Sequence, residues 1–340
     1  MYGQSMAGES GKESAAAQPG SAHFESAFEV RKLRLDDLDQ VNQVFRKAFG
    51  TQLGHPNPAE FAPGRSCFAR LAVEPDGAFG VYLDDRLVGF SCSVLWGSLG
   101  IFGPLAVLPE YWGAGVGKRL LTKSVNFFVS KGVADSALCT FPDSAKHISL
   151  YKKFGFHPGS LIAMMTKVVP DYDASNVRQS QGLFSDLAAR EKLEIIKQAK
   201  SITTAIHKGL DLSKEIEILS QYSLGETVLL VHGDQLAGFA ICHFGPGSET
   251  ESDIFYIKFA AVPPGKVAEN NFRLLLKRCE ILADSKNLNT MFCGVNTSRQ
   301  EAFETMLSEG FKIDSLSVAM QMSNRPSYNH GGIYVLDDWR

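Results

Sequence analysis

Apolar and polar residues along the chain repeat with two periods, and their order predicts strands followed by helices. Residues 28–35 alternate with the period of a strand, and the acidic stretch at 36–39 begins a helix that extends to residue 49. Apolar stretches at 77–83 and 87–95 flank a polar turn, which predicts a β-hairpin. The chain therefore begins as a sheet with a helix packed against it.

The stretch 99–121 predicts a buried strand, a glycine turn and the start of a helix. Its residues are apolar up to Leu108, and small residues at 113–117 come directly before a helical run at 118–128. Backbone N–H groups at a helix N-terminus lack partners within the helix, and glycines let an anion approach them closely. The turn is therefore expected to bind an anionic group such as a pyrophosphate.

Two common phosphate-binding loops do not fit this turn. A Walker loop ending on Gly117 and Lys118 needs glycine at 112 and Ser or Thr at 119, but Trp112 and Arg119 stand there. The dinucleotide fingerprint needs Gly or Ala at position 118, and its strand opens the fold, whereas this strand follows others. The pattern argues against a P-loop NTPase and against a Rossmann domain.

The same stretch resembles the acetyl-CoA site of the GCN5-related N-acetyltransferase (GNAT) family. The family signature is an apolar strand, a proline corner and then Gln or Arg-x-x-Gly-x-Gly or Ala at the start of a helix. The chain has an apolar strand, Pro109 and then Trp112 where the family usually has Gln or Arg. The resemblance implies that acetyl-CoA binds as a cosubstrate, and that the binding residues are Leu105, Ala106, Val107, Trp112, Gly113, Ala114, Gly115, Val116, Gly117 and Lys118.

A second motif follows a predicted strand at 136–141. GNAT proteins often show Asn-x-x-Ala-x-x-Leu-Tyr-x-x-x-Gly-Phe at this place, and the chain has Ser144-x-x-His147-x-x-Leu150-Tyr151-x-x-x-Gly155-Phe156. The resemblance covers about residues 26–170, and it implies that Tyr151 is a catalytic residue that protonates the departing CoA thiolate. A tyrosine on an apolar helix face is also typical of a packed side chain, which is the structural alternative.

The base of such a reaction is not named by the residues. An amine must lose a proton before it attacks a thioester, so a carboxylate, a histidine or a chain of water molecules must accept that proton. Asp143, at the end of a predicted strand, is the catalytic candidate, with helix capping as its structural alternative. His147 lies one helical turn before Tyr151 and either faces the site or is an ordinary surface or core histidine.

The second half of the chain looks like a degenerate copy of the first. Residues 182–222 predict helices, and the order of elements from 227 to 311 then repeats the hairpin, strand, helix, strand, helix and Gly-Phe of the first half. Prolines without N–H groups occupy 263–264, where the glycine turn belongs, and Met306 takes the tyrosine position. We expect this half to close the acceptor cleft or to stabilise the first half by sheet packing.

The expected fold class is α/β (α+β), with two GNAT-like domains, each a mixed, mostly antiparallel central sheet flanked by helices. The 340 residues suffice for two such domains. We expect a disordered tail at 1–25, a GNAT acetyl-CoA-binding catalytic domain at 26–170, a degenerate GNAT-like domain at 171–325 and a tail at 326–340 that docks on the protein through aromatic residues.

Composition narrows the setting. The six cysteines form no Cys-x-x-Cys pair, which argues against zinc and a disulfide framework and favours a reducing, cytoplasmic location; no metal is expected. The uncharged run at 87–109 is long enough to span a membrane, but its glycines, proline and serines predict two buried strands instead.

Charge divides unevenly between the halves. Residues 26–170 carry a net charge of +4 and residues 171–340 a net charge of −5. A basic first domain suits a polyanionic cosubstrate, with Lys118, Arg119 and Lys123 on or after the glycine turn. The acidity of the second half favours a cationic acceptor such as a polyamine, an amino sugar or a lysine side chain.

The sequence therefore predicts an acyl-CoA-dependent N-acyltransferase that moves acetyl from acetyl-CoA to a primary amine, on a small molecule or a peptide, by direct transfer in a ternary complex. The alternative is a non-catalytic acyl-CoA-binding or scaffold module with the same fold. Transfer to a hydroxyl or to a protein N-terminus is a third, weaker possibility. No nucleic-acid or membrane partner is expected, and the sequence specifies neither the acceptor nor the oligomeric state.

Overall fold

The computed structural model describes residues 27–133, 135–172 and 182–340, so the tail expected at 1–25 lies outside the described residues. We call residues 27–172 the first half and residues 182–340 the second half. The helices and strands of the first half are β1 (Glu29–Lys32), η1 (Leu35–Asp37), α2 (Leu38–Gln52), η2 (Pro58–Glu60), α3 (Phe68–Val73), η3 (Pro75–Gly77), β2 (Phe79–Leu83), β3 (Arg86–Trp96), β4 (Leu99–Val107), η4 (Pro109–Tyr111), α4 (Val116–Ser130), β5 (Asp135–Thr140), α5 (Ala145–Lys153) and β6 (His157–Val168).

The second half repeats this order after two helices of its own. Its elements are η6 (Phe184–Asp186), α6 (Ala189–Ile206), α7 (Ser213–Gln221), β7 (Gly225–His232), β8 (Gln235–His243), β9 (Ile254–Ala261), α8 (Ala268–Ser285), β10 (Thr290–Asn296), α9 (Gln300–Ser308), β11 (Lys312–Gln321) and β12 (Val335–Asp337). The series from β7 to β11 therefore corresponds to the series from β2 to β6.

Both halves contribute to one twelve-stranded sheet with the order β1-β2-β3-β4-β5-β11-β6-β10-β9-β8-β7, and β12 pairs with β9 at the side. Its pairs are antiparallel except β4 with β5 and β9 with β10, which confirms the predicted mixed, mostly antiparallel fold class.

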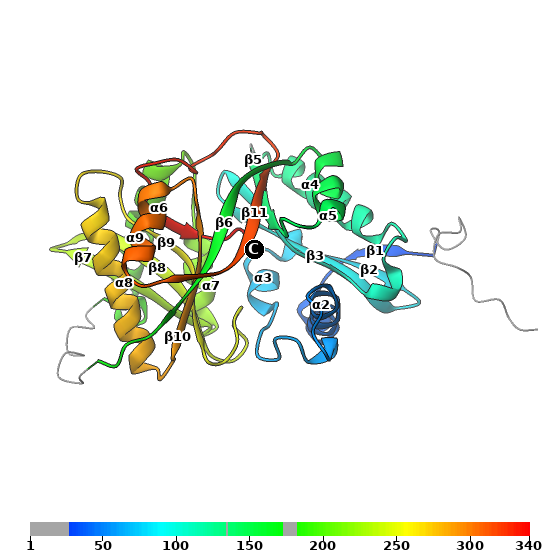
Figure 1. The fold of residues 1–340 in the computed structure, drawn as a ribbon, viewed down its shortest axis with the longest axis horizontal. Helices are drawn as coiled ribbons and strands as arrows, with labels where there is room; N and C mark the ends of the chain where they lie inside the picture. The colour runs from blue at the N-terminus through cyan, green and yellow to red at the C-terminus, as the bar shows by residue number, and fades with distance from the viewer. Residues whose placement is uncertain (1–26, 134, 173–181) are drawn as a thin grey trace, which may run out of the picture.

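The sheet shows an exchange of strands that the sequence does not predict. Strand β11 of the second half lies between β5 and β6 of the first, and β6 pairs in turn with β10 of the second half. In Figure 1, β6 in green and β11 in orange run side by side through the middle of the molecule. The two halves therefore share the centre of one sheet, while the boundaries expected at residues 170 and 325 stay predictions.

Helices cover both faces of the first half of the sheet because successive side chains of β4 point to opposite sides. Ala106 and Leu108 belong to the core formed with Phe45 of α2, whereas Val107 packs in the core formed with Leu120 of α4. The uncharged run that the sequence assigns to two strands forms β3 and β4, which are almost wholly buried. Within the described part of the chain, none of the helices has the length and apolar character needed to cross a bilayer.

Candidate functional site

The site begins where β4 and β5 separate. Their parallel pairing in the described structure comprises three residue pairs and ends at Ile101 with Ala137, although β4 continues to Val107. A β-bulge between Phe102 and Leu105 adds one residue to β4 at this point. The two strands therefore open into a gap beyond Ile101.

Main-chain polar groups of β4 point into this gap. The N–H of Leu108 donates to the carbonyl of Val88 on β3 at 2.9 Å. Because alternate residues of a strand direct their N–H and C=O groups to opposite sides, Leu105 and Val107 direct theirs away from β3. The N–H and C=O of Leu105 and the N–H of Val107 are free to bind an extended ligand that lies along the strand, whereas the C=O of Val107 accepts a hydrogen bond from Trp112.

The glycine turn lies at the end of the same strand. Helix α4 begins at Val116, and its N-cap residue Gly115 has a φ of 79°, a conformation that favours glycine. No described residue accepts a hydrogen bond from the N–H of Val116, Gly117 or Lys118. A Cβ on Gly113 would meet nothing within 4 Å, so the turn is open on its outer side. The structure therefore presents unpaired N–H donors at a helix N-terminus, as the sequence predicts for an anion site.

A cavity of about 560 Å³ joins the turn to the gap between the strands. Of the ten predicted binding residues, nine line this cavity, and Ala114 is buried in the core behind it. The first half supplies one side of the cavity from α2, β4, β5 and α5. The other side comes from the second half, through Phe292, residues 314–317 of β11, Trp339 and Arg340.

Trp112 has a structural role at this turn. Its indole Nε1 donates to the carbonyl of Val107 at 2.8 Å, and the Nζ of Lys146 lies 5.2 Å from the ring centroid. The hydrogen bond ties the glycine turn to the end of β4. Trp112 therefore differs from the polar residue of the family signature but holds the turn beside the strand.

Tyr151 lies on α5 and lines the cavity with 7% of its surface exposed. Its ring packs edge-on against Phe102, with centroids 6.1 Å apart. Burial raises the pKa of its hydroxyl well above the usual value, so the group stays protonated at neutral pH. The hydroxyl makes no hydrogen bond to a described residue, which leaves it able to donate a proton to a ligand.

Asp143 does not reach the cavity, contrary to its expected role as base. It is exposed at the N-terminal end of α5 and is not among the cavity-lining residues. Nor does it cap the helix: Ser144 is the N-cap residue, and its Oγ accepts from the N–H of His147 at 3.4 Å. The chain turns outward after β5, so a carboxylate at position 143 lies in solvent.

His147 is a titratable group that does line the cavity. It is half-buried and lines the cavity one turn before Tyr151 on the same helix. Burial lowers the pKa of its imidazole, helped by the nearby ammonium of Lys146, so the ring is neutral at pH 7. The helical spacing between His147 and Tyr151 was the sequence signal for this placement.

Two arginines at the cavity were not found by sequence reasoning. Arg65 precedes α3, and Arg340 lies at the far end of the chain, yet both line the same cavity. Arg340 is paired with Asp338, with Nε 2.7 Å from Oδ2, and its guanidinium stacks over Tyr256 and Phe292. No motif connects residues so distant along the chain, so only the fold brings them together.

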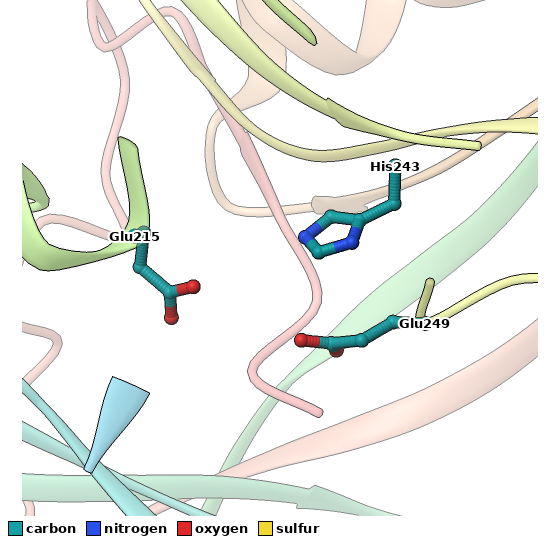
Figure 2. Close-up of side chains that lie close together, drawn as sticks. All are labelled: Glu215, His243 and Glu249. Atoms are coloured by element: carbon teal, nitrogen blue, oxygen red, sulfur yellow. The ribbon is translucent and has the colours of Figure 1, made fainter. Parts of the chain in front are cut away.

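A second cluster of titratable groups lies between the halves, and its members are not among the residues that line the cavity. Figure 2 shows Glu215, His243 and Glu249 converging from three segments, and their ligand atoms lie within 4.8 Å of one another. The Nζ of Lys258 already lies between the carboxylates, 2.7 Å from Glu215 and 2.5 Å from Glu249. Arg70 of the first half pairs with Glu249 at 2.9 Å.

This cluster acts as a clamp between the halves. Its two carboxylates are balanced by two cations, so a divalent metal would have to displace Lys258. The Nε1 of Trp96 donates to Glu215 at 2.9 Å and adds a second contact from the first half. His243 is buried without a hydrogen-bond partner among the described residues, and burial lowers its pKa to about 4.

The second half contains a gap that corresponds to the one between β4 and β5. Parallel pairing of β9 with β10 ends at Ile257 with Cys293. Beyond that point β9 pairs antiparallel with β12, from Phe259 with Asp337 to Ala261 with Val335. The chain's own C-terminal strand therefore fills this second gap.

Comparison with known proteins gives the family of the first half. Residues 38–156, about a third of the chain, match the acetyltransferase (GNAT) family model. No curated protein of known function matches the sequence significantly.

Solved structures show a similar fold along most of the chain. A putative acetyltransferase from Pyrococcus horikoshii is 16% identical with a TM-score of 0.63, over 92% of this chain and 95% of that one. A GCN5-related N-acetyltransferase from Sphaerobacter thermophilus is 12% identical with a TM-score of 0.55, over 87% and 95% of the two chains. A glucosamine N-acetyltransferase region of a fungal multi-domain β-N-acetylglucosaminidase is 15% identical with a TM-score of 0.58, over 86% of this chain and 38% of that one.

Proposed function

We propose that this chain, whose residues 38–156 form a GNAT-family domain, is an acyl-CoA-dependent N-acyltransferase. It transfers acetyl from acetyl-CoA to a primary amine by direct attack in a ternary complex. The first half binds the cosubstrate, and both halves enclose the acceptor.

One observation carries this proposal: the open glycine turn is continuous with the gap between β4 and β5. The unpaired N–H groups of Val116, Gly117 and Lys118 suit the diphosphate of CoA. The outward N–H and C=O of Leu105 and the outward N–H of Val107 suit the amide groups of the pantetheine arm, which must lie extended along β4. The cavity then provides room for the thioester and the acceptor.

The reaction needs one proton donor and one proton acceptor. The amine nitrogen forms a bond to the acetyl carbonyl carbon, the carbon–sulfur bond breaks, and its electron pair leaves on sulfur. The Tyr151 hydroxyl, which is protonated at neutral pH and whose pKa burial raises further, gives its proton to that sulfur. The nitrogen loses one proton, which balances the proton that sulfur gains.

We assign the accepting role to His147. Its lowered pKa keeps the imidazole neutral at pH 7, whereas Tyr151 on the same helix is kept protonated. Environments that push the pKa values of two neighbouring groups apart are typical of an acid and base pair. His147 reaches the cavity, and Asp143 does not.

Two measurements test the proposal. The first is the melting temperature of the full chain with acetyl-CoA, which should rise if the cosubstrate binds the folded state. The second is release of free CoA thiol with a panel of primary amines. Binding without CoA release for any amine would favour a non-catalytic acyl-CoA-binding module, and an unchanged melting temperature would contradict the proposal.

A further inference from the structure

The cavity contains a positive charge that the protein does not neutralise. Arg65 lines the cavity, and its guanidinium carbon lies 4.8 Å from the ring centroid of Phe45. Among the described residues, no carboxylate forms an ion pair with Arg65. The neighbouring Arg340 has the same charge and, together with burial, lowers the pKa of the Arg65 guanidinium.

The buried carboxylates near Arg65 and its neighbour Arg340 already have partners. Glu249 pairs with Arg70 and Lys258, and Asp338 accepts hydrogen bonds from Arg340 and Tyr256. Asp314 lines the cavity from β11, but it is exposed to solvent and makes no ion pair with Arg65. The charge of Arg65 is therefore left for a ligand.

Arg65 is partly buried, and a partly desolvated cation without a paired carboxylate is common where an anion binds. Arginine presents two parallel N–H donors, a geometry that matches a carboxylate. We propose that the acceptor is an amine that also carries a carboxylate, and that Arg65 binds this carboxylate. This inference rests on the acyl transfer proposed for the same site.

The other residues that line the cavity indicate the chemical character of the remainder of the acceptor. Phe45 lies under Arg65 and packs with Phe49 and Phe61. Further aromatic side chains of the lining come from both halves: Phe141, Phe292 and Trp339. The remaining basic side chains of the lining, Lys118 and Lys146, lie at the glycine turn and suit the phosphates of CoA. An amino acid with an apolar or aromatic side chain fits this arrangement better than the polycationic acceptor that the acidity of the second half suggests.

The end of the chain places the acceptor near the thioester. A Cβ on Gly103 would lie 3.5 Å from the carbonyl carbon of Arg340, so the tail touches β4 at its bulge. An amino acid held by Arg65 beside Arg340 therefore lies close to the opened part of β4, where the amine must meet the acetyl group.

The test compares acceptors that differ only in the carboxylate. Phenylalanine and leucine are compared with phenethylamine and isoamylamine, with kcat/KM measured from CoA release at saturating acetyl-CoA. We expect the amino acids to be preferred, and Arg65→Gln to reduce their kcat/KM about 10- to 100-fold with little effect on the two amines. Arg65→Lys should restore part of the loss, since lysine keeps the charge without the paired donors. The exposed Arg325→Gln is the matched control.

A binding measurement that needs no turnover tests this inference separately from the proposed function. Affinity for N-acetylphenylalanine and for N-acetylphenethylamine is measured by calorimetry in the presence of CoA, which needs no turnover. Loss of N-acetylphenylalanine binding in Arg65→Gln alone supports the inference even if no amine releases CoA, in which case only the transferase proposal falls. Equal use of amines with and without the carboxylate, or equal binding of the two products by the parent and Arg65→Gln, would overturn it.

Discussion

The two halves build the same gap between parallel strands, but only the first half leaves it open. In the first half, β4 and β5 separate beyond Ile101 and the gap runs into an open glycine turn. In the second half, β9 and β10 separate beyond Ile257, and β12 pairs with the exposed edge of β9. The fold creates the opening in both halves, and what occupies the opening decides whether a ligand can bind.

The plug of the second gap is firmly held. Arg299 pairs with Asp337 of β12 at 2.9 Å, both side chains being fully buried, and the hydroxyl of Tyr328 donates to the same carboxylate at 2.7 Å. The chain beyond β12 then reaches the first cavity, where Trp339 and Arg340 form part of the wall. The second half has thus closed its own gap and contributes one wall of the cavity beside the open gap of the first half.

The largest expected effect is the loss of catalytic rate on replacing Tyr151, the tyrosine that lines the cavity of the first half. Tyr151→Phe removes the proton donor, and we expect kcat to fall about 10²- to 10⁴-fold, the range typical of a lost general acid. Acetyl-CoA binding should be retained, because the ring packing remains. Steady-state CoA release checks this, with Tyr222→Phe, 41% exposed on α7's C-terminal side, as control. A Tyr151→Phe enzyme with parental kcat would remove Tyr151 from the mechanism.

The second prediction opens the plugged gap. Arg299→Met leaves Asp337 buried without its cation, and we expect a loss of about 3–5 kcal/mol in the free energy of unfolding. Hydrogen exchange should show the amides of β12 losing protection before those of its partner strand β9. Arg273→Met breaks two partly exposed pairs, with Glu269 and with Glu309, and should cost no more than about 1 kcal/mol for each pair. Full protection of the β12 amides in Arg299→Met would show that the pair between Arg299 and Asp337 does not hold β12 against β9.

The third prediction concerns the clamp that joins the halves. The folded-state pKa of His243 is about 4, below its ordinary value of 6.5. Between these values the unfolded chain binds a proton that the folded chain excludes, so stability is complete above pH 6.5 and falls as the pH drops toward 4. The loss from this group is about 3 kcal/mol.

Urea unfolding at several pH values measures this slope. His243→Phe should flatten the slope between pH 6.5 and 4, whereas the exposed His330→Gln should leave it unchanged. A parental slope in His243→Phe would mean that other groups account for the acid sensitivity.

The smallest expected effect is on acetyl-CoA affinity, and it compares the glycine turn of the first half with the proline-bearing turn of the second half. Gly117→Glu places a negative charge among the N–H donors, and a Cβ there would lie 3.8 Å from Leu150 without a clash. We expect acetyl-CoA affinity to fall about 100-fold from like-charge repulsion, with stability preserved because glycine is a poor helix former. Lys266→Glu makes a similar change at the proline-bearing turn of the second half and should not alter affinity. Equal losses in both variants would indicate a site shared by the two turns.

The parts of the site that the sequence predicted are those encoded locally. The small residues at 113–117 must form a turn before a helix, and the spacing of His147 and Tyr151 places both on one helix face. The chain could not reveal the strand exchange, because the pairing of β6 with β11 depends on which edges the whole fold leaves available. Asp143 was misplaced for a related reason, since the direction of a loop after a strand is set by tertiary packing.

The proposed role of Arg65 in acceptor recognition could not be predicted from the sequence either. Its importance comes from the absence of an ion-pair partner among the described residues, from Arg340 beside it and from aromatic rings contributed by both halves. None of these features is a pattern in the sequence around residue 65. The glycine turn and the helix that carries the proposed acid and base were thus predictable from short motifs, whereas the second-half wall of the cavity required the assembled fold.

The most direct test of the open and plugged gaps is the stoichiometry of acetyl-CoA binding, measured by calorimetry on the full chain. The account predicts one molecule per chain, with binding weakened by Gly117→Glu and unaffected by Lys266→Glu. No binding, two molecules per chain, or an affinity indifferent to Gly117→Glu would contradict it.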